Sequence, residues 1–297
     1  MKEDIIYETF DGTFPFEPHF MTVNGFRMHY VDEGEREPIV CLHGEPTWGY
    51  LYRKFIPPLS KTNRVIVPDH MGFGKSGVPQ DKPYTLAQHI DNLTKLLLKL
   101  DLHDITLVCQ DWGGPITFGF AVNHTERVKR LVIMNTAVGV FPEGSRTWVS
   151  NLEEKGTYDS FFENLRETLP VLLKSGGVGK DTEVTDIMIR AYTAPFPDKA
   201  SCIGAKAFPR DIPVGMKHPS AAVMKGIREK LGLLQDKPKI IIWGLQDPVF
   251  PKSTIDWWRK VYPGTKVYEL PEASHFLQED APEKIVKLIQ KFLRKNP

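Results

Sequence analysis

The sequence predicts an α/β protein with a mostly parallel, doubly wound sheet and an inserted helical segment. Strand-like apolar runs recur along the 297 residues, and most are followed by a turn and then a helical pattern. Several runs are continuous rather than alternating, as expected for parallel strands that helices cover on both faces. Repeated β-turn-α units with right-handed crossovers build such a sheet. The pattern is interrupted between residues 137 and 212, where no convincing apolar strand occurs.

The individual elements follow from these periodicities in chain order. The expected strands are residues 20–30, 39–42, 65–68, 105–108, 131–134, 240–243 and 266–270. The expected helices of the sheet domain are residues 85–100, 115–123, 254–262 and 282–293, and those of the insertion are 158–173 and 183–192. An insertion at the carboxyl ends of the strands would cover the crevice where such folds bind ligands. We therefore expect a core of residues 1–136 and 213–297 and a helical cap of residues 137–212.

Composition excludes several classes of function. The 38 Lys and Arg residues nearly cancel the 37 Asp and Glu residues, so the net charge of +1 gives no electrostatic footprint for nucleic acid or anionic lipid. No apolar run approaches the roughly 20 residues that a membrane span needs. The acidic N-terminal residues do not resemble a signal peptide. The odd number of cysteines, three, is typical of buried thiols in a reducing compartment, so we expect a cytoplasmic protein.

The segment Val108-Cys109-Gln110-Asp111-Trp112-Gly113-Gly114 carries the strongest chemical signal. An apolar run ends in a short polar residue followed by two glycines, and a helical pattern starts directly afterwards. This is the layout of a nucleophile elbow, a cramped strand-to-helix turn that needs small neighbours. The residue at the tip is Asp111, where many such elbows carry serine.

Two more polar residues stand where strands should end. Asp247 follows the apolar run 240–243, and His275 lies in a short loop after the run 266–270. The chain order nucleophile, acid, histidine is that of the catalytic triads built on this kind of sheet. Each residue alone has a plain structural explanation, a helix cap for the aspartate and a solvated loop for the histidine. Their joint order favours a triad of Asp111, Asp247 and His275.

Two glycine-containing loops follow the expected strands 39–42 and 65–68, earlier in the chain. The loop His43-Gly44-Glu45-Pro46 is expected to give the Glu45 backbone N–H to an oxyanion hole, with the Trp112 N–H as the second donor. A rigid structural turn is the alternative for this loop. The glycine-rich loop 68–77 lacks the spacing of a phosphate-binding loop, so we expect a structural role. No group of His, Cys or acidic residues has the spacing of a metal site.

Six segments resemble the haloalkane dehalogenase family of α/β hydrolases. They are HGEPTWGYLYRK (43–54), DHMGFGKSGVP (69–79), VCQDWGG (108–114), AYTAPFPD (191–198), GLQDPVF (244–250) and ASHFLQED (273–280). The resemblance implies an α/β-hydrolase fold, Asp111 as nucleophile, His275 as base and Asp247 as its partner. It also implies that the Trp112 indole N–H binds the departing halide.

The chemistry of the residues agrees with this resemblance. A carboxylate is anionic at neutral pH, so Asp111 needs no base to attack a saturated carbon. The product would be an alkyl ester on Asp111 and a free halide. His275 would then activate water to hydrolyse the ester, while Asp247 fixes its tautomer. We expect hydrolytic dehalogenation without cofactor or metal, on small halogenated substrates, by a monomer or small homo-oligomer.

The resemblance implies a halide site with two side-chain donors, and the sequence leaves the second donor open. Of the six tryptophans only Trp148 falls inside the insertion, so it is the expected second donor; plain packing within the cap is the alternative. Ungapped spacing would place Phe161 or Phe162 there, and phenylalanine cannot donate a hydrogen bond.

Two other functions stay open. Epoxide hydrolysis would use the same triad, with cap tyrosines such as Tyr158 and Tyr192 protonating the ring oxygen. A small-molecule receptor on a hydrolase scaffold is the non-enzymatic alternative.

Overall fold

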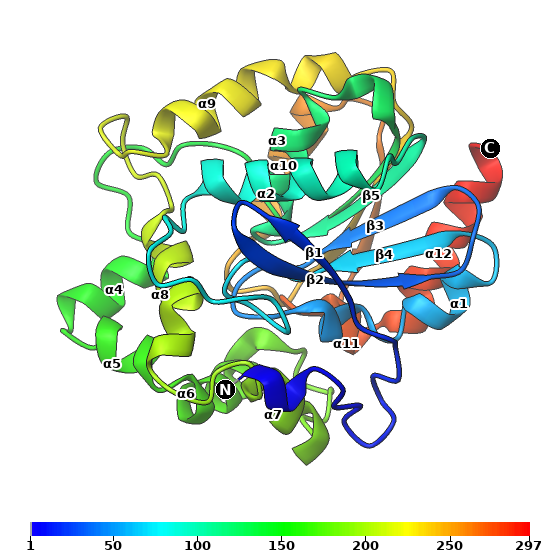
Figure 1. Cartoon of the computed structure of the whole chain (residues 1–297). Helices are drawn as coiled ribbons and strands as arrows, with labels where there is room; N and C mark the ends of the chain where they lie inside the picture. Colours follow the sequence, from blue (N-terminus) through cyan, green and yellow to red (C-terminus); the bar gives the residue numbers. More distant parts are fainter. Residues whose placement is uncertain (1) are drawn as a thin grey trace.

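The computed structural model describes residues 2–297 and has at its centre an eight-stranded sheet (Figure 1). The strands lie in the order β1-β2-β4-β3-β5-β6-β7-β8. Their bounds are β1 His19–Val23, β2 Phe26–Glu33, β3 Pro38–Leu42, β4 Arg64–Pro68, β5 Ile105–Gln110, β6 Val128–Met134, β7 Lys239–Gly244 and β8 Lys266–Leu270. β1 and β2 pair antiparallel to their neighbours, and all other pairs are parallel. The predicted α/β class and mostly parallel sheet are confirmed.

The first predicted strand, residues 20–30, is wrong as a single element. It forms the hairpin of β1 and β2, which turns at Asn24 and Gly25. Both turn residues have positive φ, 47° and 78°, as a two-residue hairpin turn requires. The Asn-Gly pair is the strongest short-range hairpin signal that a sequence offers, so this turn could be predicted from the sequence.

Helices cover both faces of the sheet. On one face α3 (Gly113–Ala121) lies between α2 (Leu86–Lys99) and α9 (Ala221–Lys230), with α10 (Lys252–Val261) beside α3. On the other face α1 (Ile56–Ser60) contacts α12 (Pro282–Lys295) (Figure 1). This two-sided cover explains why the central strands are apolar on both faces, since β3 and β5 are buried throughout.

Within residues 137–212 the chain between β6 and β7 forms helices joined by loops and no strand, which is the helical character expected there. Its helices are α4 Trp148–Glu154, α5 Tyr158–Glu163, α6 Leu165–Leu172, α7 Asp186–Thr193 and α8 Ile203–Arg210. They lie together beside the sheet domain in Figure 1. The expected single helix at 158–173 is two helices, because the backbone of Asn164 leaves the helical region with ψ of 44°.

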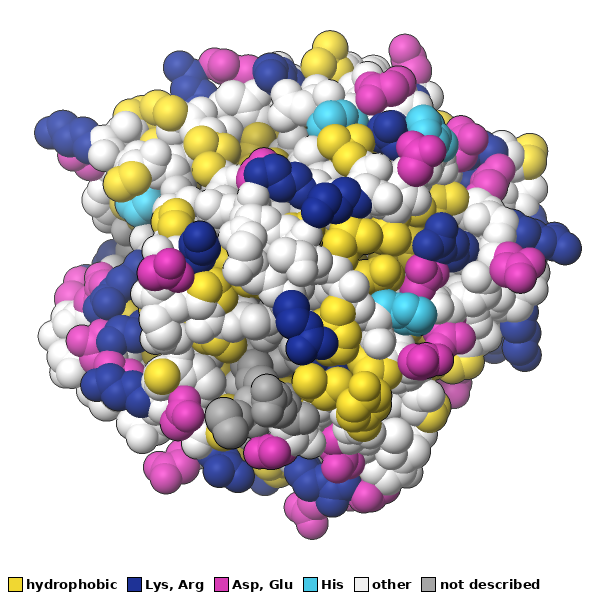
Figure 2. Space-filling model, viewed as in Figure 1, with side chains coloured by type: hydrophobic (Ala, Val, Ile, Leu, Met, Phe, Trp, Pro, Cys, Tyr) yellow, Lys and Arg dark blue, Asp and Glu magenta, His cyan; other side chains and the backbone are white. Residues whose placement is uncertain are grey.

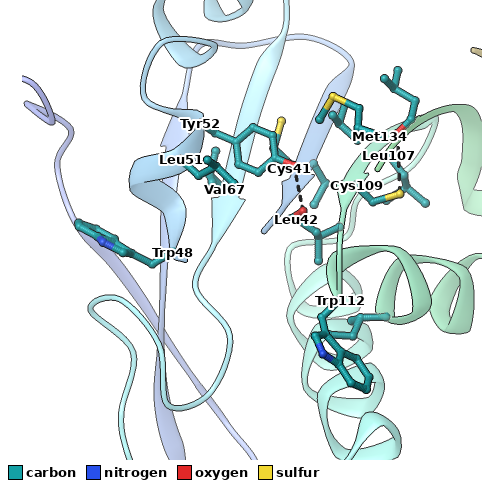
Figure 3. Packing of buried hydrophobic residues seen from close by; sticks show 14 of the residues in the cluster. Cys41, Leu42, Trp48, Leu51, Tyr52, Val67, Leu107, Cys109, Trp112 and Met134 are labelled. Atoms are coloured by element: carbon teal, nitrogen blue, oxygen red, sulfur yellow. Dashed lines mark hydrogen bonds between the residues drawn. The ribbon is translucent and has the colours of Figure 1, made fainter. Parts of the chain in front are cut away.

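The core holds the thiols that the sequence placed there. Cys41, Cys109 and Cys202 are free and buried. Figure 3 shows Cys41 and Cys109 among apolar side chains near Tyr52, whose hydroxyl donates to the Leu42 carbonyl at 2.9 Å. Burial raises the pKa of the Cys109 thiol to about 12, so it stays protonated.

The surface carries both signs of charge. Lysine, arginine and acidic side chains alternate over the face in Figure 2, with hydrophobic side chains between them. This mixture agrees with the net charge of +1. Among residues 2–297, no helix has the length and apolar character to cross a membrane.

Candidate active site

Asp111 stands on the turn between β5 and α3, as the elbow pattern predicts. Its φ is 51°, a left-handed conformation that is strained for a residue with a side chain. The turn is possible because its neighbours are small. A Cβ on Gly113 would collide with the Leu42 carbonyl, and one on Gly114 with the Thr136 hydroxyl. The strained turn lifts the Asp111 carboxylate out of the sheet edge.

Asp111, His275 and Asp247 come together at the carboxyl ends of β5, β8 and β7. His275 Nε2 lies 3.7 Å from Asp111 Oδ2, and His275 Nδ1 lies 3.0 Å from Asp247 Oδ2. Asp247 Oδ1 also accepts the backbone N–H groups of Val249 (2.7 Å) and Phe250 (3.1 Å). The acid is therefore fixed on one side by its own loop and on the other by the imidazole.

Burial and charge set the protonation of these groups. Burial is the largest influence on Asp247, yet the charge of His275 and its hydrogen bond hold the pKa of Asp247 below its usual range. Burial alone would lower the pKa of His275, but Asp247 and then Asp111 raise it. For Asp111, burial raises the pKa, while His275 and the backbone N–H groups of Trp112 and Glu45 oppose that rise.

Sequence reasoning missed the residues that hold the triad in place. Asn135, directly after β6, donates through Nδ2 to Asp247 Oδ2 at 2.6 Å. Gln110 donates through Nε2 to the His275 carbonyl at 3.1 Å. Asn135 stands at the carboxyl end of a strand, which is the same positional signal that singled out Asp247. Its partner is 112 residues away in the chain, so the contact itself carries no local signal.

A further aspartate connects the histidine loop to the inserted segment. Asp280 accepts the Ser274 N–H at 2.7 Å and the Gly179 N–H at 2.9 Å. The Phe276 N–H donates to the Gly177 carbonyl at 2.7 Å. The residues on both sides of His275 are thus hydrogen-bonded to residues 177–179, so the insertion helps to fix the position of the imidazole.

The loop after β3 approaches Asp111 as expected for an oxyanion hole. The Glu45 backbone N–H donates to Asp111 Oδ1 at 2.7 Å. Gly44 permits this approach, because a Cβ there would collide with the Asp111 carboxylate. The Glu45 carboxyl group is enclosed, and neither of its oxygens has a hydrogen-bond partner among the described residues. Burial, and then the charge of Asp111, raise the pKa of Glu45 well above its usual range, which favours the neutral form of this carboxyl group.

One cavity of about 530 Å³ is lined by the candidate catalytic groups. Asp111, His275 and Trp112 lie in its wall, and so does Trp148 from the first turn of α4. Most of the other lining residues are apolar. Trp112 also stacks on Phe208 of α8, with ring centroids 5.0 Å apart. The inserted helices and the sheet domain therefore share the wall of a single apolar chamber around Asp111.

Five of the six tryptophans fall into two groups by their indole N–H. Those of Trp48, Trp243 and Trp258 donate to backbone carbonyls, which gives these residues structural roles. Within residues 2–297, the indole N–H groups of Trp112 and Trp148 have no protein acceptor, and both residues line the cavity. Two unused donors at one apolar chamber are suited to a weakly hydrated anion.

The glycine-rich loop 68–77 does not enter this chamber. Its Asp69 is buried and accepts hydrogen bonds from His29 (2.7 Å), the Gly49 N–H (2.7 Å) and the Lys75 N–H (2.8 Å). This arrangement accounts for the loop structurally. The described residues contain no group of three or more His, Cys, Asp or Glu side chains placed to hold a metal ion.

Comparisons with known proteins agree with this architecture. The family model for the alpha/beta hydrolase fold matches residues 37–282. The chain is 36% identical to a cis-3-alkyl-4-alkyloxetan-2-one decarboxylase of Shewanella oneidensis, over 95% of this chain and 90% of that one. It is also 36% identical to a haloalkane dehalogenase of Psychrobacter cryohalolentis, over 95% and 94% of the two chains.

The solved structures lead to the same family. The tetrameric haloalkane dehalogenase DpaA of Paraglaciecola agarilytica superposes with a TM-score of 0.80 at 30% identity, covering 95% of this chain and 93% of that one. The predicted resemblance is confirmed: the chain is an α/β-hydrolase enzyme and belongs to the haloalkane dehalogenase family.

Proposed function

We propose that this protein hydrolyses haloalkanes to an alcohol and a halide through an alkyl ester on Asp111. The observation that carries the proposal is the placement of one carboxylate and two unpaired indole N–H groups in the same apolar chamber. A carboxylate displaces halide from a saturated carbon without help from a base. The indoles of Trp112 and Trp148 would stabilise the halide as it leaves, among mostly apolar side chains.

The second half of the proposed reaction uses His275. The imidazole removes a proton from water, which attacks the carbonyl carbon of the ester on Asp111. The backbone N–H groups of Glu45 and Trp112 stabilise the oxyanion, which then expels the alcohol and restores the carboxylate. Asp247 fixes the tautomer of His275 and stabilises the imidazolium. Residues 137–212 would serve as a cap that keeps bulk water away from the ester.

A second candidate comes from the relatives named for oxetan-2-one decarboxylation. Attack of Asp111 on the ring carbon that bears oxygen would open the ring and release a carboxylate, which is an anion like halide. Cleavage of the carbon–carbon bond to that carboxylate would then form an alkene and CO2, with Asp111 as the leaving group. This reaction needs Asp111 and the anion site but no water, so His275 would be dispensable.

The structure weakens support for the epoxide alternative. The Tyr158 hydroxyl donates to the Lys206 carbonyl, and the Tyr192 hydroxyl donates to Glu279 at 2.6 Å. Neither tyrosine lines the cavity. An epoxide oxygen would therefore find no tyrosine hydroxyl in the chamber.

The deciding experiment compares three substrates with the purified protein. Halide release from 1-bromobutane, diol formation from 1,2-epoxybutane and CO2 release from a dialkyl oxetan-2-one are measured side by side. Halide release without diol formation or CO2 release supports dehalogenation. Single turnover of 1-bromobutane in heavy-oxygen water with excess protein should place the isotope in the Asp111 carboxyl group. Isotope only in the alcohol would contradict an ester intermediate.

Replacing Trp148 with phenylalanine should weaken bromide binding about tenfold, because a charge-assisted hydrogen bond contributes roughly 1.5–3 kcal/mol and part of it is recovered by solvent. Bromide titration of the intrinsic fluorescence measures the affinity. Trp257→Phe is the matched control, since Trp257 is outside the cavity and its ring meets Arg228. Equal bromide affinity in both variants would assign Trp148 to packing of the cap.

Replacing Glu45 with glutamine should keep activity near pH 7, because one neutral group of similar shape replaces another. Any loss of wild-type activity with rising pH that comes from ionisation of Glu45 beside Asp111 should be absent from the glutamine variant. Profiles of kcat/KM against pH measure the difference. A large change in activity at neutral pH would mean that Glu45 is ionised there.

A further inference from the structure

We propose that the natural substrate carries a long apolar chain that runs from Asp111 to the mouth of the cavity, where Phe141, Val171 and Val249 receive it. This proposal rests on the proposed function and specifies its substrate class. The chain end would lie against three side chains that are otherwise exposed to water.

The size of the cavity is the first argument. A volume of about 530 Å³ is open beside Asp111. At roughly 30 Å³ for a water-sized group, this space holds on the order of 17 such groups. A two-carbon haloalkane has only three non-hydrogen atoms to fill this space. A short substrate would leave most of the chamber to water, which an apolar wall binds poorly.

The exposed hydrophobic side chains are the second argument. Seven large hydrophobic side chains of the described residues are strongly exposed, and three of these line this one cavity. They are Phe141 (43% exposed), Val171 (63%) and Val249 (40%). They come from three separate segments: the chain after β6, helix α6 and the loop after β7. Exposed apolar side chains that converge on one opening are typical of a ligand-binding site.

The other apolar side chains of the cavity are the third argument. Leu152, Leu172 and Met224 line the same cavity as Asp111 and the three exposed side chains. Arg146 is the cation at this cavity, and its guanidinium is paired with Glu154. An apolar chain fits this cavity better than a substrate with an anionic end.

A chain-length series tests the proposal. The probes are 1-bromoalkanes from two to ten carbons for kcat/KM, and 1-alkanols of the same lengths for binding by titration calorimetry. Burial of a methylene group contributes about 0.8 kcal/mol, which is up to about fourfold per carbon. We expect both kcat/KM and alkanol affinity to rise with length until the chain passes the rim. Phe141→Ser and Val171→Ser should lower the ratio of decyl to ethyl values.

Leu233→Ser is the matched control, because Leu233 is 60% exposed and does not line the cavity. It should leave the decyl-to-ethyl ratio unchanged. Turnover of short and long bromoalkanes at equal rates, with flat alkanol binding, would overturn the proposal while leaving dehalogenation intact. Alkanol affinity that rises with length in the absence of any turnover would contradict only the proposed reaction. If Phe141→Ser and Val171→Ser change the molar mass of the protein in solution but not the decyl-to-ethyl ratio, these side chains form an interface between copies of the chain. That result would overturn the proposal.

Discussion

Replacing His275 with phenylalanine should stop the reaction after its first step and leave the substrate's alkyl group on Asp111. Attack by Asp111 needs no base, so the first halide is still released. Hydrolysis of the ester does need one, and loss of a general base costs about 10²–10⁴-fold in rate. Incubation with 1-bromobutane should give one bromide per protein and a mass increase of one butyl group on the peptide that contains Asp111.

The control for this experiment is Asp111→Ala, which should give neither the bromide burst nor the mass increase. Phenylalanine is a suitable replacement for His275, because the ring already lies 5.8 Å from the ring of Phe250 in a stacked arrangement. Continued turnover by the His275 variant at the wild-type rate would contradict its role as base. Release of CO2 and an alkene from the dialkyl oxetan-2-one by the same His275 variant would instead favour the decarboxylation candidate.

The charges around His275 would differ between the two steps of the proposed reaction. The charge of Asp111 is among the influences that raise the pKa of His275. In the proposed reaction, ester formation would neutralise Asp111 and remove that influence. The pKa of His275 would then fall when the imidazole must accept a proton from water, so the alkyl-enzyme would contain a larger fraction of neutral base.

The sheet and the meeting of three candidate residues at one of its edges were predictable because their signals are local. Asp111, Asp247 and His275 each follow an apolar run, and parallel strands bring their carboxyl ends to one edge. The partners of these residues were not predictable. Asn135 contacts Asp247 across 112 residues, and this contact depends on the pairing of β6 with β7.

In the insertion, too, some features were predictable from the local sequence and others were not. Its helical character follows from local periodicity, but the break at Asn164 and the direction of Trp148 depend on packing between helices. Trp148 contacts the rings of Phe161 and Phe162, with centroids 6.2 Å and 5.7 Å away. The sequence could name Trp148 as a halide donor but could not place it in the cavity wall. Its role there stays a prediction.

Replacing Arg53 with methionine should lower the free energy of unfolding by about 3–5 kcal/mol, because it leaves the buried carboxylate of Glu279 without its main partner. The Glu279 side chain is fully buried and accepts a hydrogen bond from Arg53 Nη2 at 2.9 Å. It also accepts from the Tyr192 hydroxyl of α7 and from Lys54. The cluster therefore joins the sheet domain, an inserted helix and the segment that follows His275.

Urea unfolding at pH 7 measures the effect, with Lys54→Met as the matched control. The Lys54 side chain is 41% exposed and pairs with the same carboxylate, so its loss should cost less than about 1 kcal/mol. Equal destabilisation by the two variants would contradict the assignment of Arg53 as the main partner. Adding Glu279→Gln to Arg53→Met should recover part of the lost stability, because no buried charge then remains.

Acid pH should narrow the difference between the wild type and the Arg53 variant. In the wild type, burial opposes ionisation of Glu279, but Arg53 holds its pKa below the usual range. That contribution to stability is present above the unfolded-state pKa and is lost as pH falls through the folded-state pKa. In the variant, burial alone would raise the pKa of Glu279, and protonation at acid pH would remove the unpaired charge. If the difference in free energy of unfolding between the wild type and the Arg53 variant stays constant between pH 7 and pH 4, the pKa of Glu279 does not depend on Arg53.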